Sequence, residues 1–167
     1  LYGTGGNFTI QGNTIGLNAL GEPLLGSVTG ISTVDYFLGA VRDVAIGGPN
    51  PGEGNEIAGH LFNGIPVVNP FTGVRISGNS IHDNGDLGID LVASDFQYGV
   101  TLNDNLDTDA GGNGLQNFPV LSLAESLGGS VHLAGVLDSS PNGSFTVEFF
   151  ASPTCDSSGH GEGGGFL

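Results

Sequence analysis

An Asx-rich segment between residues 103 and 113 carries the side chains best suited to binding a metal ion. Oxygen-bearing side chains alternate at positions 103, 105, 107 and 109, and glycines follow. Hard cations such as Ca²⁺ take about six to eight oxygen ligands from a flexible loop. Gln116 stands where an EF-hand loop has a bidentate Glu, so a solvated acidic turn is the alternative. The candidate calcium ligands are Asn103, Asp104, Asn105, Asp107, Asp109 and Asn113.

A second group of carboxylates, Asp83, Asp86 and Asp90, could serve acid–base chemistry. Ile89 and Leu91 are expected to face inward, which would point Asp90 outward beside the other two. Paired carboxylates hydrolyse glycosidic bonds, and a polysaccharide lyase would need a base and a cation. The alternative is that these aspartates only form turns and solvated surface, because Asp-Asn-Gly and Asn-Gly-Asp are turn formers.

The histidines and the single cysteine give weaker signals. His60 and His82 lie close to one repeat length apart, but a 24-residue register places His60 opposite Asn84. Separate surface histidines are therefore favoured over a metal-binding pair. Cys155 has no partner for a disulfide within the chain, and pairing between chains stays open.

The strongest pattern along the chain is a degenerate repeat of the form I-x-G-N-[ST]-I. It occurs at positions 10–15 and again at positions 76–81. A shorter, 24-residue offset relates Asn55 to Asn79, and a second match has the same offset. We expect about three such units between the two copies of the motif, with a further rung at positions 44–48. Periods of roughly 20 to 50 residues are typical of solenoids.

Each unit contains very short alternations of apolar and polar residues, for example at Phe8/Ile10 and Ile89/Leu91. A period of two places the apolar side chains on one face of a strand, and no helical stripe competes with it. Strands this short at a constant offset are expected to stack as parallel sheets. Asn13, Asn55 and Asn79 are then expected at one corner of successive coils, stacked as a ladder of side-chain amides.

The pattern changes after residue 118. Three longer strands are expected at residues 118–123, 130–137 and 144–150, separated by Gly-Gly and Pro-Asn-Gly turns. This succession predicts an antiparallel meander that forms part of a β-sandwich. We therefore divide the chain into β-helix coils (1–98), an acidic connector (99–118) and a partial sandwich-like domain (119–167).

Composition narrows the possible partners. Two basic residues stand against 17 acidic ones, and the formal net charge is −15. Nucleic acid and anionic membrane surfaces would be repelled, and no apolar run is long enough for membrane insertion. An apolar content of 38% argues against disorder. Calcium, neutral sugars or simple solubility suit this balance better.

Several pieces of the chain resemble a known family. They are "NFTIQGNTIG", "VRDVAIGGPNPGEGNEIAGH", "NGIPV", "VRISGNSIHDNGDLGIDL", "GVTLNDNLDTDAGGNGLQNFPVL" and "FTVEFFASPTCD". Together they cover nearly the whole chain and resemble the right-handed parallel β-helix repeats of large bacterial surface proteins. In that family a "LQNFPVL" linker leads into a sandwich-like domain. The resemblance implies an exported, often surface-anchored protein of about three to four coils, without a known activity.

The fold expected from this resemblance also occurs in pectate lyases, polygalacturonases, pectin methylesterases and phage tailspikes, so fold alone does not settle function. The favoured expectation is a non-catalytic structural or adhesive segment at the bacterial cell surface. Its partners would be a polysaccharide or further copies of itself stacked end to end. The alternative is a polysaccharide lyase or glycoside hydrolase that uses Asp83, Asp86 and Asp90. A crystal-binding face ranks last, because the threonines do not recur with the 24-residue period.

Overall fold

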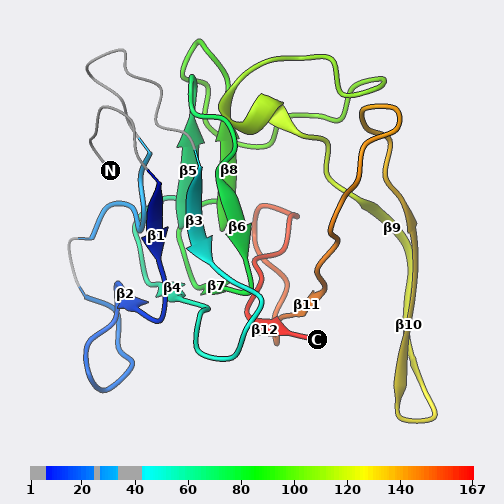
Figure 1. Cartoon of the computed structure of the whole chain (residues 1–167). Helices are drawn as coiled ribbons and strands as arrows, with labels where there is room; N and C mark the ends of the chain where they lie inside the picture. Colours follow the sequence, from blue (N-terminus) through cyan, green and yellow to red (C-terminus); the bar gives the residue numbers. More distant parts are fainter. Residues whose placement is uncertain (1–6, 25–26, 34–42) are drawn as a thin grey trace.

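The computed structural model describes residues 7–24, 27–33 and 43–167, and this part of the chain is all-β with one short 3-10 helix (Figure 1). The strands form three small parallel sheets and two antiparallel pairs. Their bounds are β1 Phe8–Ile10, β2 Thr14–Ile15, β3 Val44–Gly47, β4 Glu56–Ala58, β5 Ile65–Val68, β6 Arg75–Ser77, β7 Ser80–His82, β8 Ile89–Val92, β9 Val120–Leu127, β10 Ser130–Val136, β11 Phe150–Ala151 and β12 Gly165–Phe166; the 3-10 helix η1 spans Gly112–Leu115.

The three parallel sheets take their strands from successive passages of the chain. Their orders are β1-β3-β6, β2-β4-β7 and β5-β8, and a parallel bridge from Thr33 to Val67 extends the third sheet. We call β1, β2 and Thr33 the first repeat, β3 to β5 the second, and β6 to β8 the third. Parallel stacking of short strands was expected from their alternation, and the pairing confirms it. None of the described sheets closes on itself.

The register agrees with the sequence in one step and differs in the other. Between the second and third repeats, Ile57 pairs with Ile81 and Ile65 with Ile89, which confirms the 24-residue offset in two of the sheets. In the sheet of β3 and β6 the offset is 30 residues, because Ile46 pairs with Ile76. Between the first and second repeats the offset is larger: Ile15 pairs with Ile57, 42 residues further on, because a longer stretch of chain separates β2 from β3. The expectation of three units between the two copies of the I-x-G-N motif is therefore wrong. That interval holds two steps, and the rung expected at positions 44–48 belongs to the second repeat.

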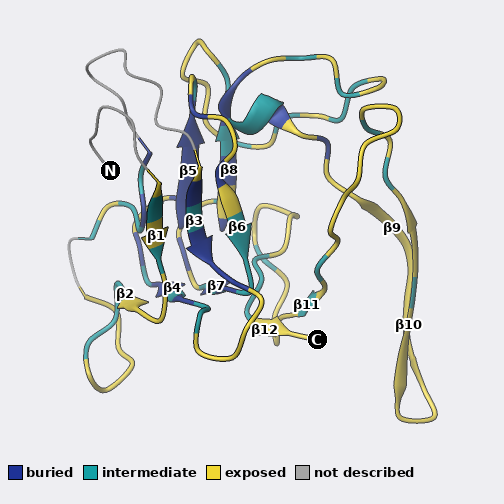
Figure 2. Ribbon diagram, in the orientation of Figure 1, coloured by how far each residue is buried: buried dark blue, intermediate teal, exposed yellow. Residues whose placement is uncertain are grey.

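The apolar core lies between the sheets and is centred on the second repeat (Figure 2). Ile46, Ile57 and Ile65 are completely buried, because each has a repeat stacked on both sides. Ile89 continues the row of Ile65 but is 43% exposed, whereas Ile81 of the same repeat is 5% exposed because the C-terminal segment bonds to its strand. Full burial of one such aliphatic side chain stabilises the fold by about 1.5–3 kcal/mol. Stability therefore depends on repeats stacking against one another.

The expected ladder of asparagines is confirmed. The backbone N–H and the Nδ2 of Asn13 both donate to Oδ1 of Asn55, at 3.1 and 3.0 Å. The same two groups of Asn55 donate to Oδ1 of Asn79, at 3.0 and 2.9 Å. Gly47 completes the corner with φ of 77°, where an added Cβ would lie 2.4 Å from Oδ1 of Asn79. Only glycine fits there, both for its backbone angle and for its size.

The part of the chain after residue 118 departs from the expected meander. β9 and β10 form an antiparallel hairpin, and nearly all of their residues are exposed. The third expected strand at residues 144–150 does not pair with β10. Only Phe150–Ala151 is a strand there, and it pairs with β12. The expected three-stranded meander is therefore wrong: the chain leaves the hairpin and returns to the third repeat, where polar side chains provide hydrogen-bond partners.

Replacing Asn55 by Ala tests the ladder. Asn55 is 2% exposed, and its removal takes the donor from the buried Oδ1 of Asn79 and the acceptor from the exposed Asn13. We expect a loss of about 2–4 kcal/mol in the free energy of unfolding, measured by urea denaturation. The control is Asn50→Ala, at an exposed residue whose side chain bonds only to Glu53. Equal losses in the two variants would contradict the role given to the ladder.

Candidate metal centre

The acidic turn lies between β8 and the hairpin and is tied to the end of the third sheet (Figure 1). Ala93 and Gly111 form a bridge, and an added Cβ on Gly112 would lie only 1.8 Å from the carbonyl oxygen of Val67. Leu106 and Asp107 have positive φ angles of 63° and 59°, which fold the segment back on itself. The turn is therefore a defined structure held against the repeats.

Three carboxylates come together in this turn. One oxygen each of Asp104, Asp107 and Asp109 lies within 4.8 Å of the other two. In the described part of the chain, no arginine or lysine forms an ion pair with them. Three negative groups at this separation repel one another unless a cation or proton lies between them.

Hydrogen bonds fix the positions of two of these carboxylates. Asp104 accepts from the backbone N–H and the hydroxyl of Thr108, and these bonds hold the pKa of Asp104 below its usual value. Asp107 accepts from the backbone N–H of Asn117 at 2.9 Å and from the hydroxyl of Ser139 at 2.6 Å. The cluster thus links the turn to both ends of the hairpin region.

Asp109 is the least satisfied member. Its Oδ1 is buried and has no hydrogen-bond partner among the described residues. Burial raises the pKa of Asp109, and repulsion from Asp104 and Asp107 raises it further. A bound cation would remove both penalties, because it supplies the missing partner and neutralises the neighbouring charges.

The expected asparagine ligands take other roles. Asn103 bonds through Oδ1 and Nδ2 to the backbone of Phe118, and Asn113 bonds in the same way to the backbone of Val74. Asn105 is exposed. Asn117 was not expected at the site, yet it is buried and bonds to the backbone N–H and carbonyl of Asp104. Asn117 lies outside the alternating pattern of the turn, and only the folded chain brings it into contact with Asp104.

The second carboxylate group does not form a solvent-facing site. Asp90 is 1% exposed, so the expectation that it faces solvent is wrong. Residues after β8 fold over it: the backbone N–H of Gly99 donates to its Oδ2 at 2.9 Å, and Nδ2 of Asn63 donates at 3.0 Å. Asp83 and Asp86 stay exposed. The three carboxylates therefore occupy different environments.

Phe96 and Tyr98, which follow β8, are the strongly exposed aromatic residues among the described part of residues 1–98. Phe71 is completely buried in the core, whereas Phe62 is 47% exposed. Tyr36 and Phe37 lie outside the described residues.

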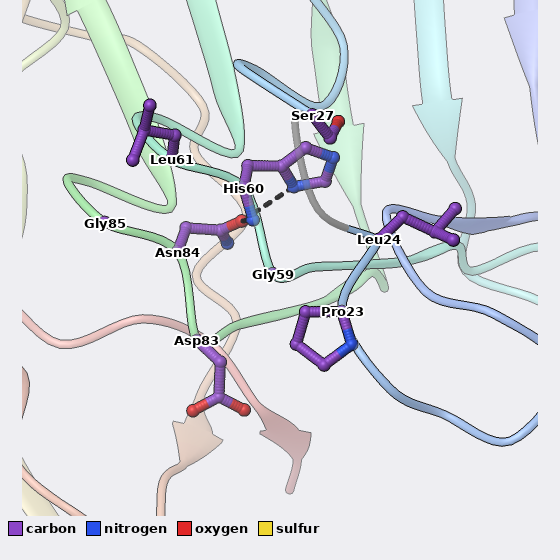
Figure 3. Close-up of a pocket in the computed structure, with 9 residues that line it drawn as sticks. All are labelled: Pro23, Leu24, Ser27, Gly59, His60, Leu61, Asp83, Asn84 and Gly85. Carbon is purple, nitrogen blue, oxygen red and sulfur yellow. Dashed lines mark hydrogen bonds between the residues drawn. The ribbon is translucent and has the colours of Figure 1, made fainter.

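The histidines have separate partners. His60 is buried, so the expectation of a surface position is wrong for this histidine. Its Nδ1 lies 2.8 Å from Oδ1 of Asn84, which confirms the expected 24-residue register (Figure 3). It lines a mainly apolar pocket of about 360 Å³, and its Nε2 is buried without a partner among the described residues. His82 instead bonds to Asp83 at 2.7 Å and lies 3.7 Å from Glu56.

Comparison with protein families, curated proteins and solved structures finds no match for this chain. Among the described residues, no helix is long and apolar enough to cross a membrane.

Asp90→Asn tests the environment of this buried carboxylate. Burial raises the pKa of Asp90, the exposed Asp86 adds repulsion, and Oδ1 of Asp90 has no partner among the described residues. The folded state thus favours the protonated form, and its contribution to stability is lost as pH rises through the raised pKa. We expect Asp90→Asn to raise the Tm at pH 7 by about 2–4 °C and to lose this advantage toward pH 3.

The matched control for this measurement is Asp95→Asn, an exposed residue near the same strand. It should show no comparable pH-dependent gain. Thermal unfolding followed by circular dichroism between pH 3 and 8 distinguishes the two variants. A lower Tm for Asp90→Asn at pH 7 would mean that the ionised carboxylate stabilises the fold, contrary to this account.

Proposed function

We propose that this chain is a non-catalytic structural or adhesive segment of an exported bacterial surface protein, stabilised by calcium. The proposed architecture is a short right-handed parallel β-helix followed by part of a β-sandwich. Support comes from the three parallel sheets, in which strands of successive repeats pair in register. The asparagines of successive repeats also bond to one another. Such stacking produces a rigid element that presents its faces to a partner.

The observation that carries the calcium proposal is the cluster of Asp104, Asp107 and Asp109. Oxygen ligands on a turn suit Ca²⁺, and extracellular modules bind it with dissociation constants of about 10⁻⁴–10⁻³ M. Because Asp107 also accepts from Ser139, an ion here would join the repeats to the segment after the hairpin. The ion would then act on stability and domain arrangement rather than on catalysis.

The proposed partners are a neutral polysaccharide or further copies of the chain. The charge of −15 disfavours nucleic acid and anionic surfaces, since binding them requires several basic side chains on one face. No observation favours a lyase or glycoside hydrolase at Asp83, Asp86 and Asp90. A glycoside hydrolase needs two carboxyl groups that converge on a substrate, and a lyase needs an accessible base beside a cation, whereas Asp90 is covered by the chain.

Calcium addition tests the proposal. At a free calcium concentration about 100-fold above the dissociation constant, the folded state gains about 2.7 kcal/mol. For a chain of this size we expect a Tm about 5–10 °C higher with calcium than with chelator. Differential scanning calorimetry at constant ionic strength measures this difference.

The informative variant is Asp109→Asn. Removing this charge relieves repulsion from Asp104 and Asp107, so the variant should melt above the unaltered chain in chelator and respond little to calcium. Asp156→Asn removes a half-buried charge outside the cluster and should keep the full calcium shift. Identical melts of the unaltered chain with calcium and with chelator would refute a calcium-stabilised module.

A further inference from the structure

The C-terminal segment covers the outer edge of the third repeat, as Figure 1 shows for β11 and β12 beside β7. The backbone N–H of Ile81 donates to the carbonyl of Gly163 at 2.9 Å, and the hydroxyl of Ser80 donates to the carbonyl of Gly164. Strand β7 therefore has β4 on one side and the C-terminal segment on the other. This segment occupies the place of a further strand.

Glu162 reproduces the hydrogen bonding of the next repeat. In one column of the stack, the backbone N–H and Nδ1 of His60 lie 3.2 and 2.8 Å from Oδ1 of Asn84. One step further, the backbone N–H and Nδ2 of Asn84 donate to the carboxylate of Glu162, at 3.1 and 2.8 Å. Glu162 thus supplies the acceptor that a fourth repeat would provide through its own asparagine.

Glu148 provides acceptors at the neighbouring corner, where Nδ2 of Asn79 itself bonds to the carbonyls of Ile46 and Ser77. Its carboxylate accepts from the backbone N–H of Gly78 at 3.0 Å and from the hydroxyl of Ser77 at 2.6 Å. These donors immediately precede Asn79, the last asparagine of the other column. We call Glu148 and Glu162 the glutamate cap. Two acidic residues distant in sequence therefore satisfy the donors that the third repeat presents at its open edge.

The opposite end of the stack has the complementary polarity. Along the asparagine column, the backbone N–H and Nδ2 of one residue donate to Oδ1 of the next, so the first asparagine of the column presents an acceptor on its outer side. Backbone hydrogen bonds between the strands run in both directions. Oδ1 of Asn13 accepts no hydrogen bond from the described residues, Asn13 is exposed, and β1 and β2 are the outermost strands of their sheets. Unpaired strand edges are templates for pairing with another chain.

We propose that the third-repeat edge is a docking surface for the first repeat of a second copy of this chain, and that the glutamate cap occupies it. The proposal rests on the structural function given above and names the partner. Donors that now bond to Glu162 and Glu148 would instead face the acceptor edge formed by β1, β2 and Asn13. Such a head-to-tail contact does not close on itself, so it can propagate into a filament.

In the unaltered chain the glutamate cap competes with a second copy for the third-repeat edge. Because the cap belongs to the same molecule, its effective concentration there is about millimolar or above. Two copies with a charge of −15 each also repel one another, and about 0.15 M salt screens part of this repulsion. We therefore expect the unaltered chain to be monomeric at micromolar concentration. Loss of the cap should shift this balance toward association.

Glu148→Ala/Glu162→Ala removes the cap. Size-exclusion chromatography with light scattering, over a concentration series in about 0.15 M salt, should show dimers and larger species. Adding Asn13→Ala should reverse the association, because it removes the acceptor of the incoming copy. Glu22→Ala/Glu125→Ala makes the same charge change at exposed sites and should stay monomeric. A folded cap-free variant that stays monomeric throughout the series would overturn the proposal.

A second measurement applies if the cap-free variant does not fold. Hydrogen exchange of the unaltered chain should show protected backbone amides at Gly78 and Asn84, the two that donate to the cap. Exchange as fast as at the exposed Gly129 turn would show that the cap does not occupy this edge, and would also overturn the proposal. The calcium response depends on other residues, so failure here is distinct from failure of the proposed function.

Discussion

Hydrogen bonding between successive repeats is the constraint on which the rest of the structure depends. Each repeat is too short to bury its own polar corner. Asn55 therefore accepts hydrogen bonds from Asn13 and donates hydrogen bonds to Asn79. A buried amide with no partner costs about 1–3 kcal/mol, which makes the register strict. The stacked isoleucines follow from this register, because the asparagines hold the strands at the offsets that align them.

The same constraint explains how the stack ends. Donors at the last repeat must be satisfied, and the chain returns after the hairpin to place Glu148 and Glu162 against them. On the neighbouring sheet, the segment after β8 covers Asp90, and Asn113 bonds to the backbone of Val74. The second half of the chain is thus attached to the repeats by polar contacts, while its own hairpin stays exposed. The carboxylate cluster lies at this junction, where a bound ion would stabilise the attachment.

The register between the second and third repeats could be predicted from the sequence, because it depends on local patterns. The 24-residue offset and the Ile-x-Gly-Asn corners predicted the pairing of Ile57 with Ile81 and the contact between His60 and Asn84. The larger offset between the first and second repeats could not be predicted, because additional residues change the spacing of the repeats but leave the Gly-Asn corner motif unchanged. Burial of Asp90 was missed because strand alternation describes one strand and does not show what folds over it. The cap was missed for a similar reason: Glu148 and Glu162 have no repeat spacing, and only tertiary contacts bring them to the edge.

The most direct test of this account is the exchange rate of side-chain amide protons, measured by nuclear magnetic resonance. The Nδ2 protons of Asn55 and Asn79 are donated within the stack, whereas Asn142 lies exposed in a turn. The account predicts that the Asn55 and Asn79 protons exchange orders of magnitude more slowly than those of Asn142. Equal exchange rates at the three residues would contradict it, because the repeats would then be held together by something other than the ladder.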